Sequence, residues 1–426
     1  MGNLNLAFLT NKVRRVRQFS STVHRLLLFA LFLGLGNGVW GLLFNLYLRQ
    51  VGYRQDFIGD LNFVMSIASA VAAPLAGLLS NRLGRRTLLV IGAVLEMVTQ
   101  LGTLWVARSE ALVVMMLIKG IAFPLWIVSF NPLLAEHSHL EERVAVFSAA
   151  NMIWLGSAMA SSVVGGWLPG LLAAVGWVPD AEGVAAYRLA ATIGNALYLP
   201  AVLYLFALPG EAEARKDQEV RLPVLPLPSG ILEVLAFFLL ISALFGLAYG
   251  VFFPFVNLYF KEHLGAPAGV VGLIMGAGQA AGVVGLSQSP ALARRLGKVR
   301  AVTVAQLTAL PFLVGLALTD QLWIGCLLFI GRYAIWNLGS SSFDAFQMEA
   351  VPDRLRALLN SLAGLPSGVG FNLAWAVGAA LGGRLIVHYG YPAILLAAVA
   401  FALPGTALYF LRFRHGTGVP HSSGER

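Results

Sequence analysis

The chain has 426 residues, of which 58% are hydrophobic and only 12% are charged, and its mean hydropathy is +0.77. A water-soluble fold of this length could hardly bury so much apolar surface, so the composition excludes that class and indicates a lipid bilayer as the solvent. The formal net charge is +9. Basic loops beside a membrane explain this charge, so no nucleic-acid partner is expected.

Apolar runs separated by charged, proline and glycine clusters predict twelve membrane-spanning helices, because each span needs about 20 mostly apolar residues. The expected fold class is therefore all-α and integral to the membrane. The first apolar run follows a basic segment as a secretory signal would, but it is too long for one and is predicted to be the first span. The predicted spans are 25–48, 57–80, 87–107, 111–134, 144–169, 187–208, 231–260, 267–292, 300–318, 321–345, 357–386 and 391–412.

Lysine and arginine are unevenly divided between the two ends of these predicted spans. Of the 29 such residues, 21 fall on the side that carries both termini, six fall on the other side, and Lys119 and Arg332 lie within spans. Cytoplasmic loops carry the excess of basic residues in membrane proteins. We therefore expect a multi-pass protein of the cell inner (plasma) membrane with both termini in the cytoplasm.

The two halves of the chain repeat each other at an offset of 212 to 213 residues. Asn45-Leu-Tyr-Leu-Arg49 falls on Asn257-Leu-Tyr-Phe-Lys261 at the outer end of the first helix of each half. Such parallel repeats are typical of transporters that hold substrate near the bilayer midplane. The predicted organisation is a cytoplasmic tail at 1–24, a six-helix bundle at 25–208, a cytoplasmic linker at 209–230, a second six-helix bundle at 231–412 and a cytoplasmic tail at 413–426.

A basic loop follows the second predicted span, with the sequence Gly77-Leu-Leu-Ser-Asn81-Arg82-Leu-Gly84-Arg85-Arg86-Thr-Leu-Leu. It resembles the signature loop of the major facilitator superfamily, G-x-L-[AS]-D-R-x-G-R-[RK]-x-x-L, except that Asn81 replaces the aspartate. The second half keeps a partial copy, Ala293-Arg-Arg295-Leu-Gly297-Lys298. The resemblance covers essentially the whole chain. It implies the fold of that family, alternating access, and a central cavity lined or bordered by the fourth and tenth helices.

Arginines of this loop are predicted to hold a cytoplasmic gate closed, since they can donate to carboxylates and to helix-end carbonyls. A plainer interpretation is that they only anchor orientation and contact lipid. Acids and arginines after the fourth and tenth spans would complete the network, with each acid seven residues before its arginine. The candidate gate residues are Gly77, Asn81, Arg82, Gly84, Arg85, Arg86, Glu136, Arg143, Arg295, Glu349 and Arg356.

Charged residues inside spans cost about 3 kcal/mol on insertion scales, so each suggests a function. Lys119 and Arg332 occupy equivalent positions in the fourth and tenth helices and could bind an anion. Lys119 has an alternative, a structural ion pair with Glu96 of the third helix, which lies at nearly the same depth. Arg332 has no such partner, because Ala309 stands where Glu96 would be repeated. Arg332 is therefore the first candidate for substrate chemistry.

Other polar and aromatic residues on the helices expected around a cavity are further candidates, although packing is the commoner role of an aromatic residue. The full set of substrate-binding candidates is Arg332, Trp336, Lys119, Asn37, Tyr249, Asn257 and Asn372. Glu96 and Asp344 are the candidate proton carriers, with Asp60 a weaker one. Two features common in antiporters of the family are absent: Ser161 stands in place of a Gly-Pro motif, and Met116 in place of an arginine.

The sequence thus predicts a secondary active transporter for a small organic solute, amphiphile or anion, with proton-coupled efflux as one form. Alternatives are a lipid flippase on the same fold and a non-transporting membrane receptor or scaffold. No phosphate-binding glycine loop, metal-spaced His/Cys set or hydrolytic triad is present, so neither enzyme activity, catalytic residues, metal nor cofactor is expected. Expected partners are the small-molecule substrate, coupling protons and membrane lipid, and the expected oligomeric state is a monomer.

Overall fold

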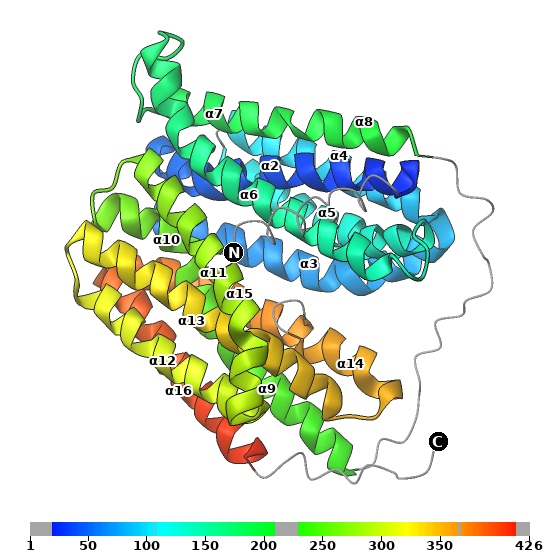
Figure 1. Ribbon diagram of the computed structural model, residues 1–426. Coiled ribbons are helices and arrows are strands. Elements are labelled where there is room, and N and C mark those ends of the chain that lie inside the picture. Colours follow the sequence, from blue (N-terminus) through cyan, green and yellow to red (C-terminus); the bar gives the residue numbers. More distant parts are fainter. Residues whose placement is uncertain (1–18, 107, 209–228, 365–367, 415–426) are drawn as a thin grey trace, which may run out of the picture. The chain divides into compact units, whose positions relative to one another are not determined.

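The structure is a computed structural model that describes residues 19–106, 108–208, 229–364 and 368–414, and all its regular elements in those ranges are helices. Twelve of the described helices are long and apolar enough to cross a membrane, which confirms the predicted fold class. The first six spans are α2 (Ser21–Val51), α3 (Gln55–Leu83), α4 (Arg85–Trp105), α5 (Ser109–Glu136), α6 (Arg143–Ala174), and α7 (Val184–Ala196) with α8 (Tyr198–Phe206). Figure 1 shows α7 and α8 following one another as a single span.

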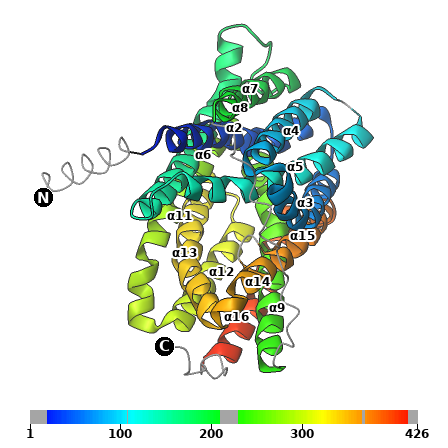
Figure 2. The same ribbon diagram turned by 90° about the vertical axis from the view of Figure 1, so that its right-hand side faces the viewer.

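The second six spans begin with α9 (Ser229–Phe252), which is continued by η1 (Phe253–Phe255), α10 (Val256–Leu258) and η2 (Tyr259–His263). The regular helix ends beside Pro254, which has no backbone N–H to continue it. The remaining spans are α11 (Ala268–Leu296), α12 (Lys298–Leu318), α13 (Leu322–Glu349), α15 (Val369–Tyr389) and α16 (Tyr391–Phe413). In both ribbon views, α12 and α13 lie side by side (Figures 1 and 2).

The predicted eleventh span, 357–386, is wrong at its beginning. The structure has a short separate helix, α14 (Asp353–Ala363), and the span itself is α15, which begins at Val369. The intervening sequence, Gly364-Leu-Pro-Ser-Gly368, contains a proline that disfavours helical backbone at the residue before it. This glycine and proline cluster is of the kind that separates the other predicted spans, so the break was visible in the sequence and was overlooked.

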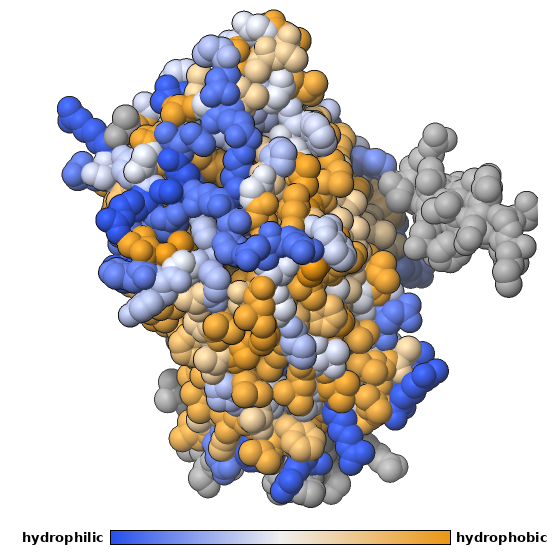
Figure 3. All heavy atoms as spheres, turned by 90° about the vertical axis from the view of Figure 1, so that its left-hand side faces the viewer, coloured by the Kyte–Doolittle hydropathy of each residue, from blue (hydrophilic) through white to orange (hydrophobic). Residues whose placement is uncertain are grey.

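Apolar side chains also cover much of the outer surface. Figure 3 shows broad apolar areas on one face, with polar and charged side chains gathered in separate patches. Large residues such as Val71, Trp105, Leu203 and Leu327 are each more than half exposed. In water this exposure would be unfavourable, whereas in a bilayer these side chains contact lipid tails.

The described residues form two compact units. The first contains residues up to Phe44 together with Val71–Val220, and the second contains Asn45–Ala70 together with the residues from Arg221 onward. Most of the predicted tails and linker lies outside the described residues. Within the second unit, the end of α2 and the first part of α3 therefore pack with helices of the C-terminal half.

Glycines let the first helix of each half approach the fifth helix closely. In the first unit, a Cβ on Gly38 of α2 would clash with the carbonyl oxygen of Ala158 on α6, and Ser162 Oγ donates to the Gly38 carbonyl at 3.1 Å. In the second unit, a Cβ on Gly250 of α9 would clash with the carbonyl of Trp375 on α15. Gly38 and Gly250 are 212 residues apart. The sequence repeat is thus also a repeat of packing.

Candidate functional site

Arg332 lies in the middle of α13 and is almost completely buried, with 1% of its surface exposed. Three aromatic rings surround its guanidinium carbon, with centroids 5.1 Å away for Tyr249, 4.5 Å for Phe252 and 5.2 Å for Trp336. Trp336 is four residues further along the same helix, and the other two rings come from α9. The predicted association of Arg332 with Tyr249 and Trp336 is therefore present in the second unit.

Two nitrogens of the Arg332 guanidinium lack the hydrogen-bond partners that a buried charge needs. Nε and Nη1 have no hydrogen-bond acceptor, and no carboxylate lies within salt-bridge distance among the described residues. Cation–π contacts contribute about 0.5–2 kcal/mol each, which offsets only part of a desolvation cost of several kcal/mol. The site can therefore gain free energy from an anion that accepts these N–H groups.

The aromatic cluster extends beyond the rings that touch Arg332. The ring of Tyr249 lies 5.6 Å from that of Trp375 on α15 and 4.9 Å from that of Phe253. Tyr249, Trp336 and Trp375 are only half-buried, whereas Arg332 behind them is not exposed. The cation thus lies beneath partly accessible rings, and sequence reasoning did not identify Trp375 or Phe253 as members of this group.

Lys119 is the repeat equivalent of Arg332, and its surroundings differ in one decisive way. Its Nζ lies 5.3 Å from the ring centroid of Trp40, the residue that corresponds to Phe252 at an offset of 212. Unlike Arg332, Lys119 also donates to Glu96 Oε1 at 2.9 Å, and both side chains are buried. The aromatic contact is repeated in both halves, but the acid is not. This geometry favours the ion-pair interpretation of Lys119 and Glu96 over a free anion site.

A hydrogen-bonded chain extends from this ion pair. Gln100 Nε2 donates to Glu96 Oε1 at 3.3 Å and to the hydroxyl of Tyr198 at 3.0 Å. Glu96 Oε2 and Gln100 Oε1 have no hydrogen-bond partner among the described residues, so this buried network is only partly satisfied. Of the two predicted proton carriers, Glu96 bonds to Lys119 and Gln100, whereas Asp344 is exposed on α13.

The asparagines predicted for a substrate site belong to both units. Asn37 is half-buried on α2 in the first unit. In the second unit, Asn257 Oδ1 accepts from the Leu258 amide at 2.9 Å, and Asn372 Nδ2 donates to the Gly368 carbonyl at 3.1 Å. The last two side chains bond to backbone close in sequence.

Arg85 and Arg86 of the signature loop each contact another helix of the first half. Gly84 has φ 87°, a conformation that favours glycine, and it separates α3 from α4. Arg85 forms an ion pair with Glu136, and the repeat-equivalent residues Lys298 and Glu349 form a second ion pair. Sequence reasoning included Glu349 but did not choose Lys298 as its partner.

Other arginines of the predicted gate bond to backbone or lie exposed. Arg86 Nη2 donates to the Phe206 carbonyl at 2.8 Å, and Arg25 donates to the next carbonyl, that of Ala207. Both cations therefore satisfy the carboxyl end of α8. Among the other predicted gate residues, Arg356 Nε donates to the Met348 carbonyl. Arg143 is half-buried, whereas Arg82 and Arg295 are exposed. A Cβ on Gly77 would meet no atom within 4 Å, and the side chain of Asn81 lies outside the described residues.

A network that sequence reasoning missed centres on Glu262 in the second unit. Its carboxylate accepts from Arg49 Nε at 2.5 Å, from Gln55 Nε2 at 2.7 Å and from the Tyr391 hydroxyl at 2.5 Å. A separate ion pair joins Arg384 to Asp60 at 2.8 Å. Asp60, the weaker candidate for a proton carrier, is thus paired with an arginine.

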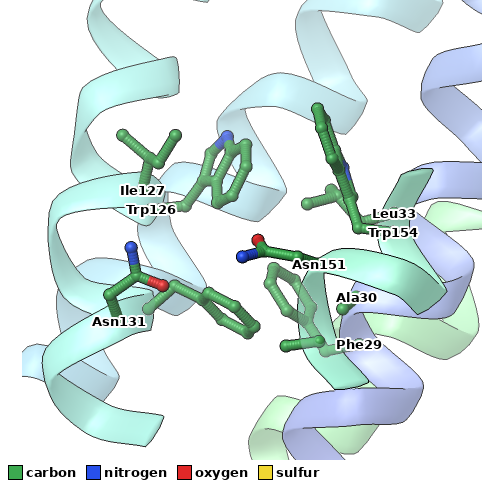
Figure 4. Close-up of a pocket in the computed structure, with 10 residues that line it drawn as sticks. Phe29, Ala30, Leu33, Trp126, Ile127, Asn131, Asn151 and Trp154 are labelled. Atoms are coloured by element: carbon green, nitrogen blue, oxygen red, sulfur yellow. The ribbon is translucent and has the colours of Figure 1, made fainter. Parts of the chain in front are cut away.

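A pocket in the first unit was also missed. It lies among α2, α5 and α6, has a volume of about 120 Å³, and is shown in Figure 4. Aromatic residues and two asparagines line it, and the full lining is Phe29, Ala30, Leu33, Trp126, Ile127, Phe130, Asn131, Ala150, Asn151 and Trp154. The one available signal was the repeat, because Asn131 corresponds to Asp344 at an offset of 213.

Comparisons with known proteins agree with this architecture. The chain is similar to a solved mutant of the nucleoside transporter NupG at a TM-score of 0.75, with 15% identity over 92% of this chain and 100% of that one. It is similar to a D-xylose-proton symporter at a TM-score of 0.69, with 16% identity over 95% and 98% of the two chains. For a bacterial homolog of the human lysosomal transporter Spinster, the TM-score is 0.70, with 15% identity over 92% and 96%.

These identities are low enough that the structural likeness shows the fold alone. A search of curated proteins by sequence gave no match. The family model described as Major Facilitator Superfamily matches residues 26–368, which is most of the chain. The chain therefore belongs to the Major Facilitator Superfamily of membrane transporters and is not an enzyme.

Proposed function

We propose that this protein is a secondary active transporter whose substrate is a small organic anion with an apolar or aromatic body. The observation that supports the proposal is Arg332, a buried cation with two N–H groups unsatisfied and three aromatic rings around it. The substrate's anionic group would accept from Nε and Nη1, and its apolar body would replace contacts among the rings. Trp336 and Tyr249 would have to move aside, since Arg332 is not exposed.

The fold by itself does not select this substrate. The similar structures are named for a nucleoside transporter, a xylose symporter and a Spinster homolog, so one architecture accommodates different solutes. Substrate chemistry must therefore be inferred from the site. In this chain, the lost equivalent of Glu96 leaves Arg332 without a carboxylate, and an anionic substrate supplies the missing group.

A matched pair of probes tests this proposal. Benzoate and benzamide have nearly the same shape and differ in charge, so purified wild-type protein should bind benzoate more tightly in calorimetry. Arg332→Gln should abolish this preference. It should weaken benzoate binding by about tenfold or more, because one charge-assisted hydrogen bond of about 1.5–3 kcal/mol is lost. Arg332→Lys should keep part of it, and Arg294→Gln, which changes an exposed arginine, should leave it unchanged. An Arg332→Gln variant with the wild-type preference would remove Arg332 from the site.

Liposome flux separates a transporter from the alternatives. Purified protein in vesicles should move labelled benzoate down its gradient, and Arg332→Gln should lose this flux. Movement of a fluorescent phospholipid in place of benzoate would indicate a flippase. Binding without movement of any solute, in any gradient, would indicate a receptor or scaffold.

Coupling and orientation extend the proposal. Asp344 is exposed and Glu96 is held by Lys119, so we propose Asp344 as the carboxylate that carries a coupling proton. Asp344→Asn should remove the effect of a pH gradient on benzoate flux while leaving benzoate binding intact. The excess of lysine and arginine on one side supports an inner-membrane protein with both termini in the cytoplasm. A phosphatase that is active only in the periplasm should therefore stay inactive when it is fused to the C-terminus.

A further inference from the structure

The pocket of the first unit is large enough to hold one aromatic ring. An engineered protein cavity of about 150 Å³ binds benzene, and this pocket, at about 120 Å³, is partly open rather than sealed. Its walls come from Phe29 and Leu33 on α2, Trp126 and Asn131 on α5, and residues 150–154 on α6. None of the ten lining residues is charged. The pocket therefore suits a neutral ring, in contrast to the cationic site around Arg332.

Two carboxamides give the pocket directional polarity. Figure 4 shows the side chains of Asn131 and Asn151 extending toward each other from α5 and α6, with the indoles of Trp126 and Trp154 beside them. Within the described part of the chain, neither amide makes a hydrogen bond to another residue, and both side chains are exposed. Each amide offers two N–H donors and one carbonyl acceptor.

The indole of Trp126 contributes ring surface to the wall, and Figure 4 shows its nitrogen on the side away from the two amides. Trp126 is 4% exposed, and its Nε1–H has no hydrogen-bond partner among the described residues. Tryptophan N–H groups usually find an acceptor when they are buried. The pocket thus combines aromatic surface for stacking with the donors and acceptors of two carboxamides that the described residues do not satisfy.

We propose that this pocket binds a flat, uncharged ring that presents an N–H beside a C=O, as a cyclic imide such as uracil does. Asparagine amides pair with such edges by two hydrogen bonds, one donated and one accepted. The indoles stack on the ring faces, as aromatic side chains do on bases. The inference goes beyond the proposed function, because it assigns a neutral ring to a pocket of the first unit, whereas Arg332 belongs to the second. Binding itself requires no transport.

Fluorine NMR of the full-length protein reports on this pocket directly. The protein is labelled with 5-fluorotryptophan, and the resonances of Trp126 and Trp154 are assigned from Trp126→Phe and Trp154→Phe. Uracil should shift these two resonances in a saturable way. It should leave those of Trp177 and Trp323, which are exposed elsewhere, unchanged. 1,3-Dimethyluracil keeps the flat ring but lacks both N–H donors, so it should bind at least about tenfold more weakly, as expected for a lost hydrogen bond of about 1.4 kcal/mol.

Asparagine variants identify the amides. Asn131→Leu and Asn151→Leu should each weaken uracil binding by about tenfold, whereas Asn62→Leu, on α3, should not change it. Because both amides are exposed and bond to no described residue, these variants should fold, and their fluorine spectra should stay dispersed. Two results would overturn the proposal: no shift of Trp126 or Trp154 up to solubility-limited uracil, or equal affinity for uracil and its dimethyl derivative.

The Arg332→Gln variant tests the pocket and the proposed anion site separately. Arg332→Gln should leave the uracil-induced shifts intact, because no charge lines the pocket. If Arg332→Gln retains the preference for benzoate while uracil still binds at Trp126 and Trp154, the anion proposal fails and the pocket stands. If the preference is lost but uracil never binds, the pocket fails and the anion proposal stands.

Discussion

Glu96 and Lys119 show at the scale of single residues how a buried charge is made tolerable. Their ion pair spans 2.9 Å inside the first unit, and both side chains are almost inaccessible. Removing one partner of such a pair leaves an uncompensated charge and costs about 3–5 kcal/mol in soluble proteins. We therefore expect Glu96→Gln and Lys119→Met each to lower the thermal unfolding temperature of the detergent-solubilised protein by several degrees.

The double variant Glu96→Gln/Lys119→Met provides the control. Since it removes both charges, it should recover most of the unfolding temperature that either single variant loses. Benzoate binding should survive in this double variant if the ion pair is structural. An effect equal to the sum of the single variants would mean that the two charges are not coupled, and the ion-pair interpretation would then fail.

Arg332 could be identified as a candidate site residue from the sequence, but the residues around it could not. The repeat aligns Lys119 with Arg332 and Glu96 with Ala309, so the missing acid is visible in the sequence. The rings of Phe253 and Trp375 come from other helices, and their approach depends on tertiary packing. Asn131 and Asn151 were missed for the same reason, because two amides 20 residues apart have no characteristic motif.

At the scale of helices, Gly38 and Gly41 offer a matched comparison on α2. A Cβ on Gly38 would clash with the carbonyl of Ala158 and with Ser161 Oγ, whereas a Cβ on Gly41 meets no atom within 4 Å. Gly38→Ala should therefore separate α2 from α6 and destabilise the protein by about 1–3 kcal/mol, the usual range for overpacking. Gly41→Ala should be neutral or slightly stabilising, because alanine favours helix over glycine by about 1 kcal/mol.

Thermal unfolding of both glycine variants in the same detergent measures this difference. Gly250→Ala, at the repeat-equivalent position in α9, should behave like Gly38→Ala, since its Cβ would meet the carbonyl of Trp375. Equal unfolding temperatures for Gly38→Ala and Gly41→Ala would show that α2 and α6 do not rely on close approach.

Helix number and type were predictable because twelve long apolar runs leave few alternatives in a bilayer. Helix boundaries were less so. The separation of α14 from α15 was missed, although polar residues of α14 and the cluster Gly364-Leu-Pro-Ser-Gly368 interrupt the apolar run. The intra-half ion pairs of the signature loop also depend on the turn at Gly84, which places Arg85 near Glu136.

At the scale of the whole molecule, the second unit joins segments that are far apart in the sequence. Glu262 binds Arg49 and Gln55 from the first two spans and Tyr391 from the last. A protein that alternates access must break such contacts to open at this end of the spans. Arg49 and Glu262 are 27% and 24% exposed, so their ion pair contributes only about 1 kcal/mol or less.

We expect Glu262→Gln to favour the conformation that is open at this end. Cys326 is the sole cysteine, so Cys326→Ser gives a background in which one introduced thiol reports accessibility. Ser66→Cys is a suitable reporter, because Ser66 lies on α3 within the second unit and is only 6% exposed. A loss of about 1 kcal/mol from the closed form should raise the labelling rate of this thiol by a water-soluble maleimide about fivefold.

Glu233 supplies the matched control for Glu262. It is the other glutamate of the same span, lies at the opposite end, and pairs with Arg412 at 3.2 Å. Glu233→Gln removes a comparable ion pair without touching the network, so the labelling rate of Ser66→Cys should stay at the reference value. Equal rates in the Glu262→Gln and Glu233→Gln variants would mean that the Glu262 contacts do not hold this end closed. A rate that rises only in Glu262→Gln, and falls again when substrate stabilises the closed form, would tie this network to the transport cycle.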